Sequence, residues 1–385
     1  MSDKSKRKGN PRRRFLFQIL LITGAIAAVI SAGIYVLTPK GAQIVFIAPD
    51  DEGLNQIWTA YVNNPENPRQ LTTFAENITL VNLYAAENSN RVVFHQSDGV
   101  YASLWTLNPQ TGQIQQIRRC EQTHSCTWVL LSPDGNWLAI EDMHYVTESS
   151  HETLIRIVDL DGRTDTNTIF TIETSVNVDI SSPLLGWIGD TVVYRPHPDT
   201  NPSEIAFYDA ANNEIVDTGE VVENSNAFTL EFSSDGTYYN NMLFRYGGES
   251  VQVAEIYAID DAYTVQFSTS SEFNPMIDNY GTFQDWHPDS QQFLSVSSGY
   301  ANGDVVWHRV NHHNIEDNST QILIGSDGQY SFNHATYNHD GSKILYYRYD
   351  TALRQGQFMI YDVETGEETA LPLSGTNPKW VNRGR

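Results

Sequence analysis

Basic residues are scarce after the first fourteen positions. The chain has 23 Lys and Arg against 47 Asp and Glu, and seven of the bases lie within residues 1–14. Residues 15–385 therefore hold 16 bases against 46 acids, which is a net charge of −30. A body this acidic repels a phosphate backbone, so nucleic acid is excluded as an expected partner. Its acidity also suits a soluble surface that needs no partner at all.

Charge is absent altogether from residues 15–37, FLFQILLITGAIAAVISAGIYVL. As a helix this run would be about 34 Å long, enough for a hydrocarbon core of about 30 Å. Bases precede it, and basic flanks stay on the cytoplasmic side. We therefore predict a single-pass signal-anchor in the cell membrane, with residues 1–14 as a cytoplasmic tail and 38–42 as a linker. Residues 43–385 are then extracytoplasmic, either periplasmic or extracellular.

A cleaved signal peptide is the alternative to this anchor. Its apolar region would normally be about 7–15 residues long and would end at a small-residue cleavage site. The run here is longer, and Tyr35–Lys40 offers no such site. These two differences favour an anchor that is not cleaved.

Cysteine is also scarce, with only Cys120 and Cys126 in the whole chain. Neither lies near residues 15–37, which excludes lipid attachment to a cysteine there. In an oxidising compartment the pair can close a small disulfide loop. Two free thiols are one alternative, and a metal site would need His124 and further ligands. The predicted location outside the cytoplasm favours the disulfide.

The remainder of the chain repeats a turn motif about every fifty residues, a period typical of propellers and solenoids. The clearest copies are LSPDGNWLAI (131–140), SSDGTYYNNMLF (233–244), WHPDSQQFLSV (286–296) and NHDGSKILYY (338–347). Aligned at the last residue of the turn, seven copies end at Asn90, Gly135, Asp190, Gly236, Ser290, Gly341 and Gly384. Pro presets φ in such turns and Gly accepts positive φ. Strand-like segments flank each turn, and two more follow, so each copy predicts a four-stranded blade.

The two ends of the repeating region complete one another. From Gln43 to about Phe74 there are three strand-like segments and no innermost one, whereas Pro378–Val381 is an innermost segment with nothing after it. Pairing them closes a ring and leaves only short, protected edges. The predicted fold class is all-β: a seven-bladed β-propeller closed by a C-terminal inner strand and preceded by one transmembrane helix. A six-bladed ring would require a weak copy, 78–119 or 181–222, to be something else.

The SPDG-type turn, followed by an apolar strand and a D-x-x-G turn, resembles the TolB-like propeller family, also called WD-like β-propeller repeats. The resemblance covers nearly all of residues 41–385. It implies a closed ring of blades around a central channel, used for binding proteins or small ligands. The resemblance does not identify a binding partner, because proteins with a propeller fold include both binding modules and enzymes. TolB itself has a second, non-propeller domain where this chain has its predicted membrane span.

Catalytic motifs of related propeller proteins are absent from the sequence. Peptidases of the prolyl-oligopeptidase type need a G-x-S-x-G nucleophile elbow, and none occurs. Sialidase repeats need S-x-D-x-G-x-x-W, which Ser97-Asp98-Gly99 does not fit. The segment from Asp159 to Asp165 looks like a calcium loop, but it lacks the Glu that such a loop needs at its twelfth position, so we predict a turn. We therefore expect no cofactor and no enzymatic activity.

The sequence contains eleven histidines, a residue type that often binds metals. Some propeller polysaccharide lyases with similar repeats gather histidines from several blades around a metal at the channel. His334, which begins an inner segment, and His144, which ends a second segment, are weak candidates for such a site. Satisfied or solvated histidines are the ordinary interpretation. A metal-dependent glycan lyase or hydrolase that uses the channel stays the alternative function.

Arginines recur beside tyrosines where second strands end and third strands begin. Loops at this rim vary without disturbing the blades, so binding residues collect on them. Arg and Tyr are also frequent binding anchors. The sequence predicts a ligand-binding rim formed by Arg195, Arg245, Arg348, Tyr246, Tyr300 and Tyr349. The alternative is that each arginine pairs with acids of the adjacent blade.

The function expected from these features is a binding or scaffold module displayed outside the membrane. Its ligand would be a protein or a small molecule, with glycans and carboxylates suited to the arginine rim. A structural subunit of an envelope complex is the second alternative, with the acidic outer faces as its docking surface.

Overall fold

The computed structural model describes most of the chain after residue 41. The described residues are 42–86, 89–120, 124–147, 150–161, 167–175, 183–196, 203–221, 230–244, 252–258, 265–268, 278–301 and 304–381. The chain divides into two units, Met1–Gly41 and Ala42–Arg385, and all described residues belong to the second. The predicted cytoplasmic tail and membrane span lie outside them. Within the described ranges, no helix has the length and apolarity needed to cross a bilayer.

The described residues form β-sheets and no helix, and every strand pair but one is antiparallel. In one sheet the order is β28 (Thr376–Val381), β1 (Gln43–Pro49), β2 (Asn55–Tyr61) and β3 (Asn64–Gln70). The next holds β4 (Thr79–Ala85), β5 (Val92–Ser97), β6 (Ala102–Leu107) and β7 (Ile114–Cys120). A third holds β8 (His124–Leu131), β9 (Trp137–Thr147), β10 (Ser150–Asp159) and β11 (Asn167–Ser175).

The second half of the chain continues this pattern. One sheet holds β12 (Leu184–Ile188), β13 (Thr191–Tyr194), β14 (Ser203–Asp209) and β15 (Glu214–Val221). An eight-stranded sheet joins β16 (Leu230–Phe232), β17 (Tyr238–Phe244), β18 (Gln252–Ala258) and β19 (Val265–Ser268) to β20 (Asp278–Trp286), β21 (Gln292–Ala301), β22 (Asp304–Asn314) and β23 (Ser319–Ser326). The last holds β24 (Tyr330–Tyr337), β25 (Lys343–Asp350), β26 (Gln355–Asp362) and β27 (Glu368–Ala370).

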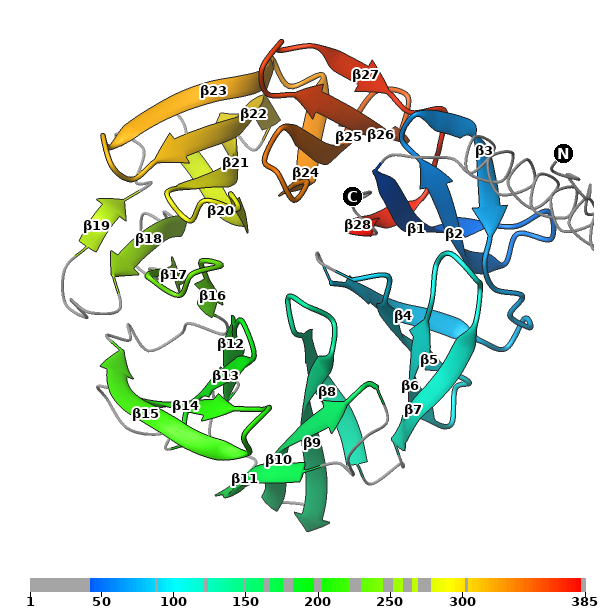
Figure 1. The fold of residues 1–385 in the computed structure, drawn as a ribbon. Coiled ribbons are helices and arrows are strands. Elements are labelled where there is room, and N and C mark those ends of the chain that lie inside the picture. The colour runs from blue at the N-terminus through cyan, green and yellow to red at the C-terminus, as the bar shows by residue number, and fades with distance from the viewer. Residues whose placement is uncertain are drawn as a thin grey trace, which may run out of the picture. The chain divides into compact units, whose positions relative to one another are not determined.

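Figure 1 shows these sheets following one another around a centre, with the first strand of each nearest to it. The innermost strands are β28, β4, β8, β12, β16, β20 and β24. The C-terminal β28 pairs antiparallel with the N-terminal β1, and Gln43 lies opposite Val381. This is the pairing that the incomplete ends of the sequence predicted. The described part is therefore an all-β, propeller-like fold that its own terminal strand closes.

The turns after the innermost strands explain the repeated glycines. Gly341 has a φ of 71°, and a Cβ there would lie 1.7 Å from Nε2 of His287 in the preceding turn. The aligned Ser290 adopts the same left-handed conformation, with a φ of 61°. In the third copy Gly189, at 55°, takes this conformation, rather than Asp190, which the alignment had placed there. The turn at Gly189 is two residues shorter, because Trp187 pairs with Val192, five positions on, whereas Trp286 pairs with Phe293, seven positions on.

Tryptophans on alternate innermost strands link neighbouring innermost strands. Each donates its indole N–H to a backbone carbonyl of the preceding innermost strand. The bonds join Trp187 to Leu130 (3.0 Å), Trp286 to Glu231 (3.0 Å) and Trp380 to Thr336 (3.1 Å). An innermost strand has one edge without a strand neighbour, and these donors satisfy part of that edge.

A disulfide bond joins Cys120, at the end of β7, to Cys126 in β8, with 6.0 Å between their Cα atoms. Both side chains are buried, and they pack with Val93, Val129 and Leu138. The bond therefore links the outermost strand of one sheet to the innermost strand of the next.

Candidate functional site

The ends of five neighbouring innermost strands surround a pocket of about 490 Å³, which we call the inner-strand pocket. Residues of β4, β8, β12, β16 and β20 and of their turns line it. Its large apolar side chains are Trp128, Trp187, Phe232 and Trp286. Small-molecule pockets are usually about 300–1,000 Å³ in volume and are lined mainly by apolar and aromatic groups. This pocket fits both criteria.

Trp128 presents the most accessible aromatic surface in the inner-strand pocket. It is 39% exposed, whereas Trp187 and Trp286 are each 8% exposed. The register between β8 and β9 shifts between Cys126 and Trp128, which is a β-bulge. Bulges re-aim side chains and are frequent beside functional sites. The bulge lies directly before Trp128 in β8.

The polar groups of the pocket include two carboxylates. Asp285 Oδ2 accepts a hydrogen bond from the backbone N–H of Tyr337 at 2.7 Å. The surface of Glu231 is in part open to solvent, but the strands around it remove water from its carboxyl group. This desolvation raises the pKa of the Glu231 carboxyl, and the charge of Lys379 on β28 lowers it by a smaller amount. No Lys or Arg is among the described residues that line the pocket. Aromatic faces beside carboxylates favour apolar groups and cations.

A second pocket, of about 430 Å³, lies on the predicted ligand rim, and we call it the rim pocket. Arg348 lines it, with its guanidinium carbon 5.0 Å from the ring centre of Tyr330. Arg348 Nη2 donates to Oε1 of Gln357 at 3.3 Å, and Nη1 lies 3.8 Å from Oε2 of Glu368. The acid that Arg348 contacts belongs to its own sheet, not to the adjacent one that the sequence analysis considered.

The structure places the other predicted rim residues differently. Arg195 is fully buried directly after β13, so it belongs to the interior and offers no exposed anchor. Tyr349 is half-buried in β25, next to Arg348. Tyr300 pairs through its backbone with Asp278, and its side chain lies outside the described residues. The remaining two, Arg245 and Tyr246, also lie outside them. Of the described members of the six, only Arg348 lines the rim pocket, and Tyr349 is its neighbour along β25.

The two weak metal candidates are on different strands. His334 is exposed on the innermost strand β24, with a φ of 54°. Desolvation by the surrounding strands, and secondly Lys379, lower its pKa. His144 lies in β9 with its backbone opposite His124, and its side chain lies outside the described residues. Among the residues whose placement is described, no group of three His, Cys, Asp or Glu side chains is arranged to hold a metal.

The inner-strand pocket was not foreseen from the sequence. Its residues were assigned no functional role, because a strand pattern does not show which aromatic stays exposed. A signal was present: an aromatic residue stands directly before several of the turns, at Trp187, Phe232, Trp286 and Trp380. This pattern marks the ends of four innermost strands, three of which (β12, β16 and β20) line the pocket.

No family model matches the sequence, and no curated protein does. Several solved structures are similar in fold. A putative 6-phosphogluconolactonase from Bacteroides fragilis is 12% identical, with a TM-score of 0.51, and the alignment covers 90% of this chain and 99% of that one. A functionally unknown protein from Desulfotomaculum acetoxidans is 11% identical, with a TM-score of 0.50 and coverage of 89% and 99%.

TolB from Acinetobacter baumannii is 12% identical, with a TM-score of 0.45. The alignment covers 88% of this chain but only 66% of the TolB chain. At such identities a likeness shows the fold and transfers no activity. The chain therefore has a propeller-like, all-β fold, and its function has to be argued from its own residues.

Proposed function

We propose that residues 43–385 form a seven-bladed, TolB-like propeller, held outside the cytoplasm by residues 15–37, that acts as a binding module. The blade number depends on the eight-stranded sheet. β16–β19 and β20–β23 are joined by a single parallel pair, Gln252 opposite Tyr280, whereas antiparallel ladders connect the strands within each group. We count the two groups as separate blades, which gives seven.

The inner-strand pocket is the proposed binding site, and the exposed ring of Trp128 is the observation that carries this assignment. Exposed aromatic side chains in a pocket are frequent anchors of binding energy. Asp285 adds negative charge to the same pocket, and Glu231, whose pKa burial raises to about 7, adds a second charge above that pH. The body's net charge of −30 would also steer a basic partner toward it. The proposed ligand is an apolar segment of a partner protein that carries a basic side chain.

A displayed library of random peptides, selected on the full chain in detergent, tests this proposal. We expect selected peptides to combine an aromatic or aliphatic residue with Lys or Arg. Trp128→Ala should weaken their binding by roughly tenfold or more, as truncated aromatic hot spots do. Above pH 7, where Glu231 is ionised, Glu231→Gln should weaken binding less, and its effect should shrink at high salt.

Leu353→Ala is the matched control, because Leu353 is 68% exposed and lines the rim pocket instead. It should leave the affinity of the selected peptides unchanged. Peptides that lose affinity with Leu353→Ala or Arg348→Ala, but not with Trp128→Ala, would move the site to the rim. Failure to enrich any peptide would contradict a protein ligand.

A further inference from the structure

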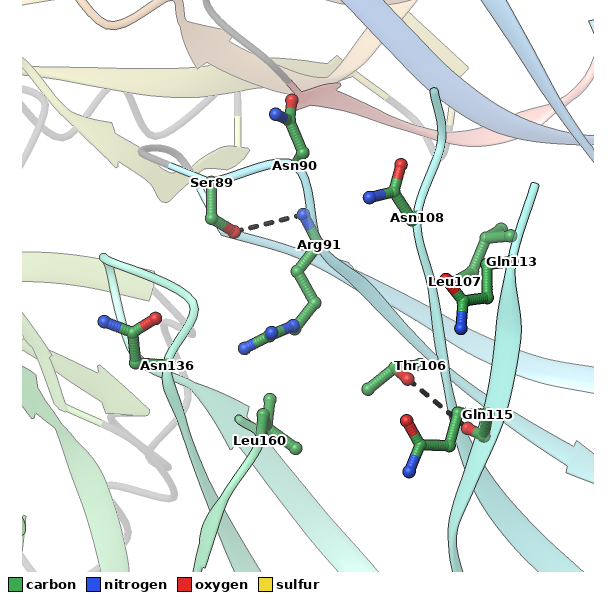
Figure 2. Close-up of a pocket in the computed structure, with 10 residues that line it drawn as sticks. All are labelled: Ser89, Asn90, Arg91, Thr106, Leu107, Asn108, Gln113, Gln115, Asn136 and Leu160. Carbon is green, nitrogen blue, oxygen red and sulfur yellow. Dashed lines mark hydrogen bonds between the residues drawn. The ribbon is translucent and has the colours of Figure 1, made fainter. Parts of the chain in front are cut away.

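A third pocket, of about 250 Å³, lies between the sheet β4–β7 and the sheet β8–β11 (Figure 2). Five carboxamide side chains line it, and we call it the amide pocket. They are Asn90, Asn108, Gln113, Gln115 and Asn136. Figure 2 shows residues of β6 and β7 on one side of the hollow and the turns that hold Asn90 and Asn136 on the other. This concentration of one polar, uncharged group distinguishes it from the inner-strand pocket.

Local structure fixes how these amides are presented. Asn108 Oδ1 accepts the backbone N–H groups of Gln110 at 2.9 Å and Thr111 at 3.1 Å, which leaves its NH₂ group for the pocket. Asn90 Oδ1 accepts from the side chain of Gln110 at 3.3 Å. Asn136 instead donates to Asp134, which leaves its carbonyl oxygen. The three asparagines thus offer two donors and one acceptor in fixed positions.

Gln113 and Gln115 add groups that can both donate and accept. Gln113 directly precedes β7, where its carbonyl accepts the backbone N–H of Asn108 at 2.9 Å, and Gln115 lies two positions further on in β7, so their side chains point to the same side. Within the described part of the chain, neither side chain has a hydrogen-bond partner. Both are exposed, so both are available to a ligand from solvent. Such a set of hydrogen-bond donors and acceptors is complementary to neighbouring hydroxyl groups on a ligand, because each hydroxyl group can both donate and accept a hydrogen bond.

The pocket carries little net charge. Arg91 lines it, but its Nη2 contacts Oδ1 of Asp161 at 2.9 Å and its Nη1 donates to the carbonyl of Gly135 at 2.7 Å. The guanidinium is therefore neutralised and occupied by the neighbouring sheet. Leu160 supplies an apolar wall beside the amides. The lining thus combines uncharged hydrogen-bonding groups with one apolar surface.

We propose that the amide pocket binds a single neutral sugar ring. Its hydroxyl groups would bond the amides of Gln113, Gln115 and Asn108, and its C–H face would pack on Leu160. The volume lies below the roughly 300–1,000 Å³ of sites for drug-sized ligands, which suits one ring. An acidic sugar fits less well, because Arg91 is already paired and the body is acidic.

The test is saturation-transfer NMR of the full chain in detergent with glucose, galactose, mannose and N-acetylglucosamine as separate probes. We expect weak, saturable binding of at least one of them. The double substitution Gln113→Ala with Gln115→Ala should weaken it by roughly tenfold or more through the lost hydrogen bonds. Gln116→Ala is the matched control, because Gln116 is exposed on the opposite face of β7 and should bind as the parent does.

Three results would overturn the proposal: no signal from any neutral sugar, equal binding by the double variant, or equal loss in Gln116→Ala. A signal from glucuronate that exceeds every neutral sugar would also contradict the neutral ring. Surface substitutions at exposed glutamines change stability by about 0.5 kcal/mol or less, so the variants should stay folded. Trp128→Ala should leave sugar binding unchanged, which separates this site from the inner-strand pocket.

Discussion

Two neighbouring groups of strands, β20–β23 and β24–β27, place different kinds of side chains at equivalent buried positions. In the first group Ser295 lies opposite Asn311, and Phe293 lies opposite His313. In the second, the corresponding pairs are Tyr346 with Met359 and Ile344 with Tyr361. Each of these eight side chains is buried. The same register positions therefore hold a polar network in one group and a largely apolar core in the next.

The polar group is stable because its buried atoms have partners. His313 Nε2 lies 2.7 Å from Ser295 Oγ, and its Nδ1 lies 2.9 Å from Thr320 Oγ1. Asn311 donates to Ser295 at 3.2 Å and to Ser297 at 2.9 Å. Buried polar groups are tolerated when they are hydrogen-bonded. The comparison shows that the two groups share the same strand register and the same buried positions. Whether a buried position is polar or apolar depends on the side chains that it contacts within its own group.

The largest effect should come from the apolar group. Phe358 is fully buried and contacts the ring of Phe46 with 5.4 Å between centroids, so Phe358→Ala removes packing both within its sheet and across to β1. Truncating a buried Phe costs about 3–5 kcal/mol. We expect this loss in the unfolding free energy measured with urea. Leu353→Ala, on an exposed residue, should change it by about 0.5 kcal/mol or less.

The polar group should make stability depend on pH. Burial, and secondly His312, lower the pKa of His313 to about 3. An unfolded His titrates near about 6.5, so between these values the unfolded chain binds more protons and stability falls as the pH falls. The slope is at most about 1.4 kcal/mol per pH unit for one group. Urea unfolding at pH 7 and at pH 5 should show this loss.

His313→Gln keeps a hydrogen-bonding side chain without a titration in this range, so the loss between pH 7 and pH 5 should shrink. His308 and His312 also have pKa values lowered by burial, so part of the dependence should persist. An unchanged pH dependence in the variant would mean that His313 is not protonated on unfolding.

A smaller loss of unfolding free energy is expected when only a polar contact at the edge of the apolar group is removed. Tyr346 donates its hydroxyl to Oε2 of Glu368 at 2.5 Å. Tyr346→Phe keeps the packing and removes this bond, so we expect a loss of about 0.5–1.5 kcal/mol by urea unfolding. A loss as large as that of Phe358→Ala would show that the hydroxyl, not the ring, dominates at this position.

The smallest effect is expected at Arg348, whose guanidinium lies 3.8 Å from Glu368 and is partly exposed. Partly exposed ion pairs contribute about 0–1 kcal/mol and weaken with salt. Arg348→Ala should therefore lower the unfolding free energy by about 1 kcal/mol or less, and by less again in high salt. A larger, salt-independent loss would make Arg348 a packing residue instead of a rim residue.

The sequence was most informative where a local rule repeats. The incomplete segment after Gln43 and the lone strand at Pro378–Val381 predicted the pairing of β1 with β28. Turn chemistry located the left-handed residues at Gly135, Gly236, Ser290 and Gly341. It failed by one residue at Gly189, where the turn is shorter and the alignment depended on a constant length.

The site was less predictable, because exposure depends on contacts between distant segments. Arg195 was expected at the surface as a charged residue after a strand, yet it is fully buried. Trp128 was assigned no role from the sequence, yet it is 39% exposed beside a bulge in β8. Neither burial nor a bulge follows from spacing along the chain. The amides at Asn90, Asn108 and Gln115 come from separate strands and turns, so no local motif joins them.

Hydrogen exchange of the full chain, with and without a selected basic, apolar peptide, tests the central claim most directly. The proposed binding at the inner-strand pocket predicts slower exchange at 128–133, 185–188, 230–234 and 285–288, with residues 349–357 of the rim unchanged. Protection confined to 349–357, with none around Trp128, would contradict it and assign the ligand to the rim.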